Sequence, residues 1–219
     1  MQMTAKPKGL AKIWREVKRP FRQARAWFRG EAYELTYYQE VAKKRQLAGE
    51  NTWEQSFAYS PAMQQRTQKM VSLLQERNIQ SLMDLGCGQQ ECSQILAEGI
   101  AYYPVDLYAH CPDTHIMDLN AGEFLEIPVD VIFCSGSLEY IYDLDRLIGK
   151  FVCYGKSVLC SYCTTDTHPS RNAIWVNHFS HSGFIQLFQR HGYTLSQEIL
   201  PSDESSGNHI YFFDKQVNS

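Results

Sequence analysis

The residues best suited to chemistry surround a glycine turn within Ser81–Leu96, which reads SLMDLGCGQQECSQIL. The apolar run 81–85 predicts a buried strand, which Gly86 and Gly88 interrupt before Glu91–Leu96 resumes with helical spacing. Because glycine has no side chain, the backbone of such a turn can approach a ligand closely. A strand that feeds a helix through this turn is the first unit of a doubly wound sheet, and ligands bind at the carboxyl end of that strand.

The charges near the turn narrow the class of ligand. A dinucleotide-binding turn reads G-x-G-x-x-G, but Glu91 stands at its third glycine, where a carboxylate would repel a pyrophosphate. Asp106 follows Gly86 by 20 residues, at the end of a second apolar run, and an acid there accepts hydrogen bonds from ribose hydroxyls. S-adenosyl-L-methionine (SAM) has a ribose, a sulfonium and an ammonium but no phosphate, and therefore fits better than a dinucleotide, which remains the alternative.

Four motifs resemble, in order and spacing, those of the class I SAM-dependent methyltransferases: DLGCG at Asp84–Gly88, PVDL at Pro104–Leu107, MDLN at Met117–Asn120 and SGSLEYI at Ser135–Ile141. The resemblance covers roughly residues 70–219. It implies a cofactor site with Asp84, Gly86, Cys87 and Gly88 around the methionine part of SAM, Asp106 and Leu107 at the ribose, Asp118, Leu119 and Asn120 at the adenine, and Ser135, Gly136 and Ser137 below the sulfonium. This family usually has G-x-G-x-G, and here Gln90 replaces the last glycine. That departure leaves open a displaced or weakened cofactor site, or an inactive scaffold or regulator with the same fold.

The rest of the chain alternates between strand and helix patterns, which predicts a doubly wound, mainly parallel α/β sheet. Strands are expected at 101–106, 115–119, 129–134 and 157–161, helices at 31–47, 61–77, 143–151 and 180–191, and a final hairpin at 194–200 and 209–213. The resemblance implies a seventh, antiparallel strand, as in the Rossmann-like methyltransferase fold. The predicted domains are a helical extension over 1–30 and a methyltransferase domain over 31–219. The latter divides into a helical lid at 31–78 and an α/β core at 79–219, with Trp53, Phe57 and Tyr59 as candidate lid residues.

The extension over residues 1–30 differs in charge from the rest of the chain. It holds nine Lys or Arg and one acid, Glu16, whereas the remaining residues hold 12 basic and 23 acidic side chains. Apolar residues recur at steps of three and four, which predicts a basic amphipathic helix with a kink at Pro20. Such a helix suits an anionic membrane surface. Docking on the acidic body or on a partner, and binding to nucleic acid, are the alternatives.

The cysteines and histidines predict no metal site. Seven cysteines in an irregular pattern indicate reduced thiols in a cytoplasmic protein, peripheral at the inner face of the membrane if the extension binds there. The C-x-x-C motif at Cys160–Cys163 lacks a second pair. No His spacing argues for ligation, His110, His115, His181, His191 and His209 included. No apolar run is long enough to span a bilayer, and no signal peptide is recognisable.

Candidate acceptor contacts lie in the segments that follow the fourth and fifth predicted strands. Tyr140 replaces the His of a Glu-His pair seen in ubiquinone-pathway methyltransferases, so a hydrogen-bonding or packing role is expected in place of a base. The loop 163–179 is longer than a connection requires, and His178 in it is the candidate proton acceptor. Asn177 and Trp175 beside it are further candidates for acceptor contact, and Arg171 could pair with an anionic acceptor.

The sequence therefore predicts a SAM-dependent methyltransferase that acts by in-line transfer, at oxygen, on a small-molecule, saccharide or lipid-linked acceptor. A nucleic-acid acceptor is disfavoured because Ser135-Gly136-Ser137-Leu138 stands where enzymes that methylate nucleobase amino groups have Asp/Asn-Pro-Pro-aromatic, and because the body is acidic. An RNA methyltransferase guided by the basic helix is the remaining alternative.

Overall fold

The computed structural model describes residues 31–52, 60–168, 171–205 and 207–216 of the chain. The predicted basic extension over 1–30 and the candidate lid aromatics Trp53, Phe57 and Tyr59 lie outside these residues. No helix within the described ranges is both long and apolar enough to cross a membrane.

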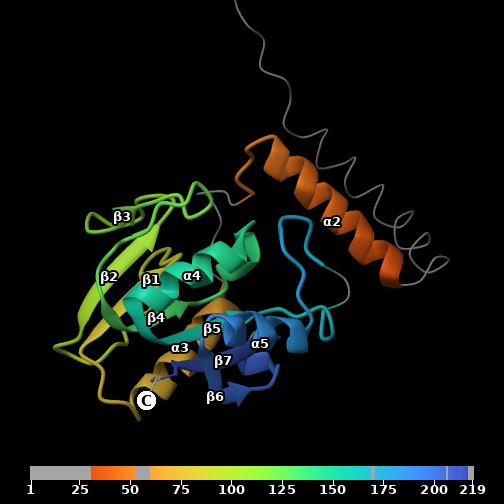
Figure 1. Ribbon diagram of the computed structural model, residues 1–219. Coiled ribbons are helices and arrows are strands. Elements are labelled where there is room, and N and C mark those ends of the chain that lie inside the picture. Colours follow the sequence, from red (N-terminus) through yellow and green to blue (C-terminus); the bar gives the residue numbers. More distant parts are fainter. Residues whose placement is uncertain (1–30, 53–59, 169–170, 206, 217–219) are drawn as a thin grey trace, which may run out of the picture.

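A seven-stranded sheet forms the centre of the molecule, with strand order β3-β2-β1-β4-β5-β7-β6 (Figure 1). Neighbouring strands from β3 to β5 are parallel, and β7 is antiparallel to both β5 and β6. The predicted fold, a mainly parallel seven-stranded sheet with helices and one antiparallel strand, is confirmed. The strands are β1 (Ser81–Leu85), β2 (Ala101–Asp106), β3 (His115–Ile116), β4 (Val129–Cys134), β5 (Gly155–Tyr162), β6 (Tyr193–Ile199) and β7 (His209–Lys215).

Helices cover both faces of the sheet because its central strands are apolar on both sides. In β4, Ile132 and Cys134 face a core that includes α4 (Leu144–Tyr154) and α5 (His181–Arg190). Val131 and Phe133 face the opposite core, which includes α3 (Pro61–Leu74). Continuous apolar runs are typical of such doubly covered parallel strands.

The predicted helix start after the glycine turn is wrong, since residues 88–95 form turns and residue 96 a bend. The amide of Leu96 donates to the Cys92 carbonyl at 3.0 Å, and the Ser93 hydroxyl donates to the Gln90 carbonyl at 2.8 Å. A serine that bonds a nearby carbonyl competes with the helical pattern, and Cys and Ser are weak helix formers. The Glu91 carboxylate is therefore not at a helix N-terminus, and the charge argument against a pyrophosphate loses that part of its basis.

Several other element boundaries differ from the predictions. The strand expected at 115–119 is limited to the two residues of β3, the helix expected to reach residue 77 ends at Leu74, and α4 extends three residues beyond 151. Three helices begin at a capping side chain: Ser60, Asp143 and Ser180 each accept a backbone amide at the start of their helix. The helix α2 (Glu31–Leu47) has its predicted bounds and lies apart from the sheet, beside the loop that follows β5 (Figure 1).

Candidate active site

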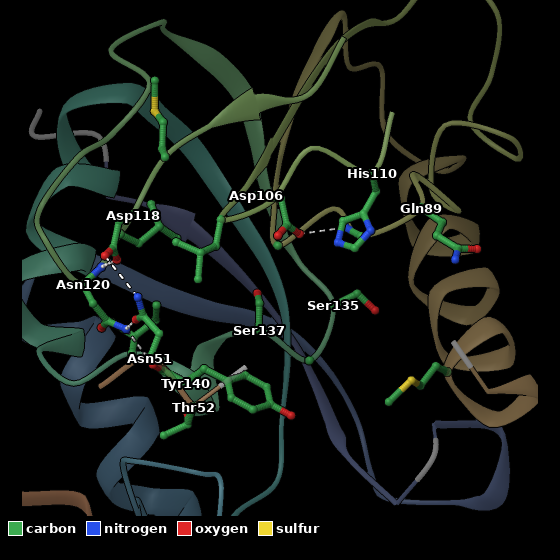
Figure 2. Close-up of a pocket in the computed structure, with 18 of the residues that line it drawn as sticks. Asn51, Thr52, Gln89, Asp106, His110, Asp118, Asn120, Ser135, Ser137 and Tyr140 are labelled. Atoms are coloured by element: carbon green, nitrogen blue, oxygen red, sulfur yellow. Dashed lines mark hydrogen bonds between the residues drawn. The ribbon is translucent and has the colours of Figure 1, made fainter. Parts of the chain in front are cut away.

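A cavity opens at the carboxyl ends of β1, β2 and β4, where a doubly wound sheet binds ligands. Most of the predicted cofactor residues line it, and Figure 2 shows their side chains around one space. The predicted residues that line the cavity are Gly86, Gly88, Asp106, Leu107, Asp118, Leu119, Asn120, Ser135, Gly136, Ser137 and Tyr140. Asn51, Thr52, Met63, Arg66, Gln89, His110, Met117 and Ile141 line it in addition, although they were not predicted.

The glycine turn passes so close to Ser137, which follows β4, that no side chain fits at Gly86. Its φ is +79°, and an added Cβ would lie 2.5 Å from the Cβ of Ser137. The Ser137 hydroxyl donates to the carbonyl of Leu85 at 2.6 Å, which holds the two segments together. The turn thus presents bare backbone to the cavity, as its sequence predicted.

Gln90 adopts a left-handed backbone conformation, which glycine adopts without strain. Its φ is +58°, the only positive value of a non-glycine residue in the described part of the chain. The side-chain amide donates to the Asp113 carboxylate at 2.8 Å and to the Thr114 hydroxyl at 3.3 Å. Because the side chain is buried by these contacts and does not line the cavity, the substitution leaves the cavity open.

Asp106 ends β2 with its carboxylate at the cavity (Figure 2). One carboxylate oxygen accepts the amide of Gly88 at 2.9 Å, and the other accepts the amide of Tyr108 at 3.2 Å. These bonds fix the orientation of the carboxylate, and each oxygen retains lone pairs for further donors. A pair of neighbouring hydroxyl groups, as on a ribose, is the donor set that such a carboxylate fits.

Asp118 and Asn120 form the far side of the cavity, and hydrogen bonds to other segments of the chain hold their side chains in place. The Asn120 amide donates to the carbonyl of Tyr140 at 3.0 Å, and its carbonyl accepts the amide of Tyr142 at 2.9 Å. Asp118 accepts the side-chain amide of Asn51 at 3.3 Å, so the segment after α2 lies over the cavity (Figure 2). A cover by the 31–78 region was predicted, but not that Asn51 supplies it.

Two predicted cofactor residues, Asp84 and Cys87, do not line the cavity. Asp84 is buried in β1 and accepts the Tyr102 hydroxyl at 2.6 Å. Burial raises the pKa of Asp84 to about 7, an effect that the Tyr102 bond opposes and the nearby Asp106 increases. Burial also raises the pKa of the Cys87 thiol well above its usual value. Both side chains lie behind the turn and support it from within.

His178, the predicted proton acceptor, does not line the cavity. Its Nδ1 accepts the Nε–H of Arg171 at 3.2 Å, and its ring centroid lies 6.3 Å from that of Tyr38 on α2. Burial and the adjacent Arg171 charge lower the pKa of His178 to about 4. His178 therefore belongs to the contact between the loop 163–179 and α2, and its position does not support the predicted role.

Of the other predicted loop residues, Arg171 and Asn177 are buried and Trp175 is half-buried. Arg171 is buried and donates to the carbonyls of Cys163 and Asn177, with its guanidinium 4.5 Å from the Trp175 ring centroid. Asn177 bonds the carbonyls of Leu138 and Ile141. These contacts fix the position of the turn that carries Tyr140. The loop therefore shapes the cavity indirectly, through that turn. Arg171 is not directed toward an anionic acceptor.

Arg66 is the main residue that the sequence analysis missed. Its guanidinium donates to the Ser135 hydroxyl at 3.2 Å and to the Ser135 carbonyl at 3.1 Å, and it is the only Lys or Arg among the residues described at the cavity wall. A Cβ on Gly136 would lie 2.5 Å from the same guanidinium. The signal was present in the sequence, because helical spacing from Met63 and Met70 places Arg66 on the inward face of α3.

No protein-family model and no curated protein matches the sequence. Solved structures do match. The N-methyltransferase NodS from Bradyrhizobium japonicum WM9, in complex with S-adenosyl-L-homocysteine (SAH), is 14% identical, with a TM-score of 0.58 over 82% of this chain and 98% of that one. The magnesium protoporphyrin IX methyltransferase from Synechocystis PCC 6803 with bound SAH is 14% identical, with a TM-score of 0.55 over 71% and 84%.

A third similar structure is the 1,6-didemethyltoxoflavin-N1-methyltransferase of Burkholderia thailandensis, with bound 1,6-didemethyltoxoflavin and SAH. It is 12% identical, with a TM-score of 0.56 over 99% of this chain and 93% of that one. The second and third of these enzymes are named for different substrates, and the likeness of all three structures to this chain is one of fold. The chain has the fold of the class I SAM-dependent methyltransferases.

Proposed function

We propose that the protein is an enzyme that transfers a methyl group from SAM to a small-molecule, saccharide or lipid-linked acceptor, at oxygen. The observation that carries the proposal is the Asp106 carboxylate, fixed by the Gly88 amide at the edge of an open cavity. Asp118 and Asn120 line the same cavity across from it. This is the polar arrangement that an adenosyl group requires, with backbone in place of side chains at the turn.

The residues divide the cavity into parts with different roles. Asp106 would hold the ribose, and Asp118 with Asn120 would hold the adenine. The guanidinium of Arg66 is the matching charge for the methionine carboxylate. SAM supplies an activated methyl group on its sulfonium, and much of the rate enhancement of such a displacement can come from holding the two reactants in line.

Tyr140 is the candidate acceptor contact at the cavity. Burial raises the pKa of its hydroxyl above the usual value, so the group stays protonated at neutral pH. It would therefore donate a hydrogen bond to the acceptor oxygen and would not remove a proton from it. Met63 and Ile141 line the cavity as well and supply apolar contact for the acceptor.

Calorimetry with SAM and SAH tests the first step of the proposal. The full chain should bind one equivalent of each. Asp106→Asn keeps an oxygen for the Gly88 amide but loses the charge, and a charge-assisted hydrogen bond contributes about 1.5–3 kcal/mol. Affinity should fall roughly 10- to 150-fold. Asp145→Asn, on the exposed side of α4, is the matched control and should bind like the wild type. No binding of either ligand to the wild type would indicate a scaffold instead.

Incubation of cell extracts with radiolabelled SAM tests transfer and identifies the acceptor class. Label should appear in small molecules, glycans or lipids, and label confined to RNA would contradict the proposed acceptor.

We also propose a cytoplasmic protein whose residues 1–30 contact an anionic membrane, since these residues form a basic amphipathic pattern. Co-sedimentation with anionic liposomes, with and without residues 1–30, tests this contact, and equal binding of both chains would contradict it.

A further inference from the structure

Two histidines and a glutamate from three separate elements meet on the side of the sheet that carries β6 and β7. His181 is the first residue of α5, Glu198 lies in β6, and His209 begins β7. One oxygen of Glu198 lies 2.7 Å from Nδ1 of His209 and 3.5 Å from Nδ1 of His181. One ligand atom from each residue lies within 4.8 Å of the others. None of the three lines the cofactor cavity.

The fold holds these side chains in place from several directions. The antiparallel pairing of β6 with β7 sets Glu198 opposite Tyr211, one residue from the end of the hairpin. Ser180 caps α5 and so fixes His181 at its first turn. His209 is almost fully buried, and the rings of His181 and His209 stack with centroids 4.8 Å apart. The cluster is therefore built into the packing of α5 against the hairpin, which Figure 1 shows side by side.

We propose that His181, Glu198 and His209 bind a divalent transition metal of the zinc class. Two imidazole nitrogens and one carboxylate oxygen are ligands that Zn²⁺ accepts, and calcium and magnesium prefer sets made of oxygen alone. The hydroxyl of Tyr211 lies 3.0 Å from Nδ1 of His181, so it is a neighbour able to orient that ring or a bound water. Binding requires small side-chain shifts to bring all three ligand atoms to about 2.0–2.2 Å from the ion.

The metal would connect three elements that already meet through side-chain packing, polar side-chain contacts and strand pairing. By joining the start of α5 to both strands of the hairpin, it would fix the end of the segment that connects β5 to α5. This role is structural, because the cluster is separate from the cavity. The site escaped sequence analysis because its residues are 17 and 11 positions apart, which matches no local ligand motif.

Metal titration of the full chain tests the proposal. Chelator-treated protein should bind one equivalent of Zn²⁺ by calorimetry, and the ion should raise the melting temperature, since a ligand of the folded state stabilises it. Glu198→Gln and His181→Ala should each weaken binding by more than the roughly 10- to 100-fold that loss of an outer-sphere partner costs. His191→Ala removes a histidine outside the cluster, whose Nε2 lies 3.1 Å from the Asp145 carboxylate, and this variant should bind Zn²⁺ like the wild type.

Thiols are the main competing ligands, so their contribution is measured separately. Of the seven free cysteines, only Cys111 and Cys153 are not buried, and replacing both with Ser should leave Zn²⁺ binding unchanged. Co²⁺ bound to the wild type should show ligand-field bands without thiolate charge-transfer absorption. This measurement does not depend on whether the variants fold. Absence of Zn²⁺ binding by the wild type, thiolate absorption with Co²⁺, or unchanged binding by folded Glu198→Gln would each overturn the proposal.

Discussion

Asp84 is a buried acid whose protonation is linked to the stability of the fold. Its pKa rises from 3.8 to about 7, chiefly through burial. The folded protein therefore holds a proton that the unfolded chain releases above pH 4, and the resulting stabilisation is lost as the pH rises through 7. The turn at the cavity is thus supported by a group that is partly neutral at physiological pH.

Asp84→Asn should remove this dependence on pH. Relative to wild type, the free energy of unfolding of the variant should increase by on the order of 4 kcal/mol between pH 4 and pH 8, measured by urea denaturation at each pH. Tyr102→Phe removes the hydrogen bond that lowers the pKa of Asp84, so it should extend the loss of stability to higher pH. A difference between Asp84→Asn and wild type that does not vary with pH would contradict this interpretation.

Gln90 combines a strained backbone with two side-chain hydrogen bonds, and substitutions separate the two effects. Gln90→Ala keeps the positive φ, which costs about 1–2 kcal/mol in a non-glycine residue, and loses both bonds. Gln90→Gly loses the same two bonds, but glycine adopts the positive φ without this cost. We expect the Ala variant to be about 1 kcal/mol less stable than the Gly variant in urea denaturation, with SAM affinity similar in both. Equal stabilities would mean that the backbone there is unstrained.

Single residues could be predicted where the chemistry depends on the backbone or on a strand end. Gly86 and Asp106 belong to this group, because a close approach requires glycine and a strand end fixes the position of an acid. His178 could not be placed, since the course of a long loop depends on tertiary contacts such as the one with Arg171. Arg66 was missed because a cation on a mostly polar helix is usually solvated, although its helical spacing places it on the inward face, where it donates to Ser135.

The elements that matched their predictions have strong local signals. Ser60 before Pro61 marks the start of α3, and the apolar run of β4 can only be a buried strand or helix segment. The segment after β1 was predicted wrongly because its helical spacing rests on only three apolar residues, Cys92, Ile95 and Leu96. Of these, Cys92 is buried whereas Ile95 is exposed, so no amphipathic face exists there to stabilise a helix.

Asn177 joins the loop after β5 to the turn that carries Tyr140. It accepts the Tyr162 hydroxyl at 2.6 Å and donates to two carbonyls at 2.7 and 2.8 Å. Asn177→Ala leaves these buried groups without partners, so we expect a loss of about 2–4 kcal/mol in the free energy of unfolding. Asn172→Ala, in an exposed position of the same loop, should change it by about 0.5 kcal/mol or less. Similar losses in both variants would show that the loop is not fixed through Asn177.

The two halves of the sheet differ in how they are covered. α4 and α5 follow β4 and β5, whereas in the described chain no helix separates β1 from β2, β2 from β3, or β3 from β4 (Figure 1). β3 has only two residues, both exposed. The alternation of strand and helix patterns predicted a mainly parallel sheet, but not this asymmetry, because turns and coil can close a crossover without a periodic pattern.

Amide hydrogen exchange should report this asymmetry across the molecule. Local opening is easiest where few apolar contacts are buried, so the turns at 88–96 and the strands β2 and β3 should exchange faster than β4, β5 and β7. Because the cavity lies on the less covered half, SAM should slow exchange at 86–90, 106–108 and 118–120 and leave the slow strands unchanged. Mass spectrometry of peptides with and without SAM measures both effects. Uniform exchange over the sheet would contradict the first expectation, and protection by SAM confined to β6 and β7 would contradict the second.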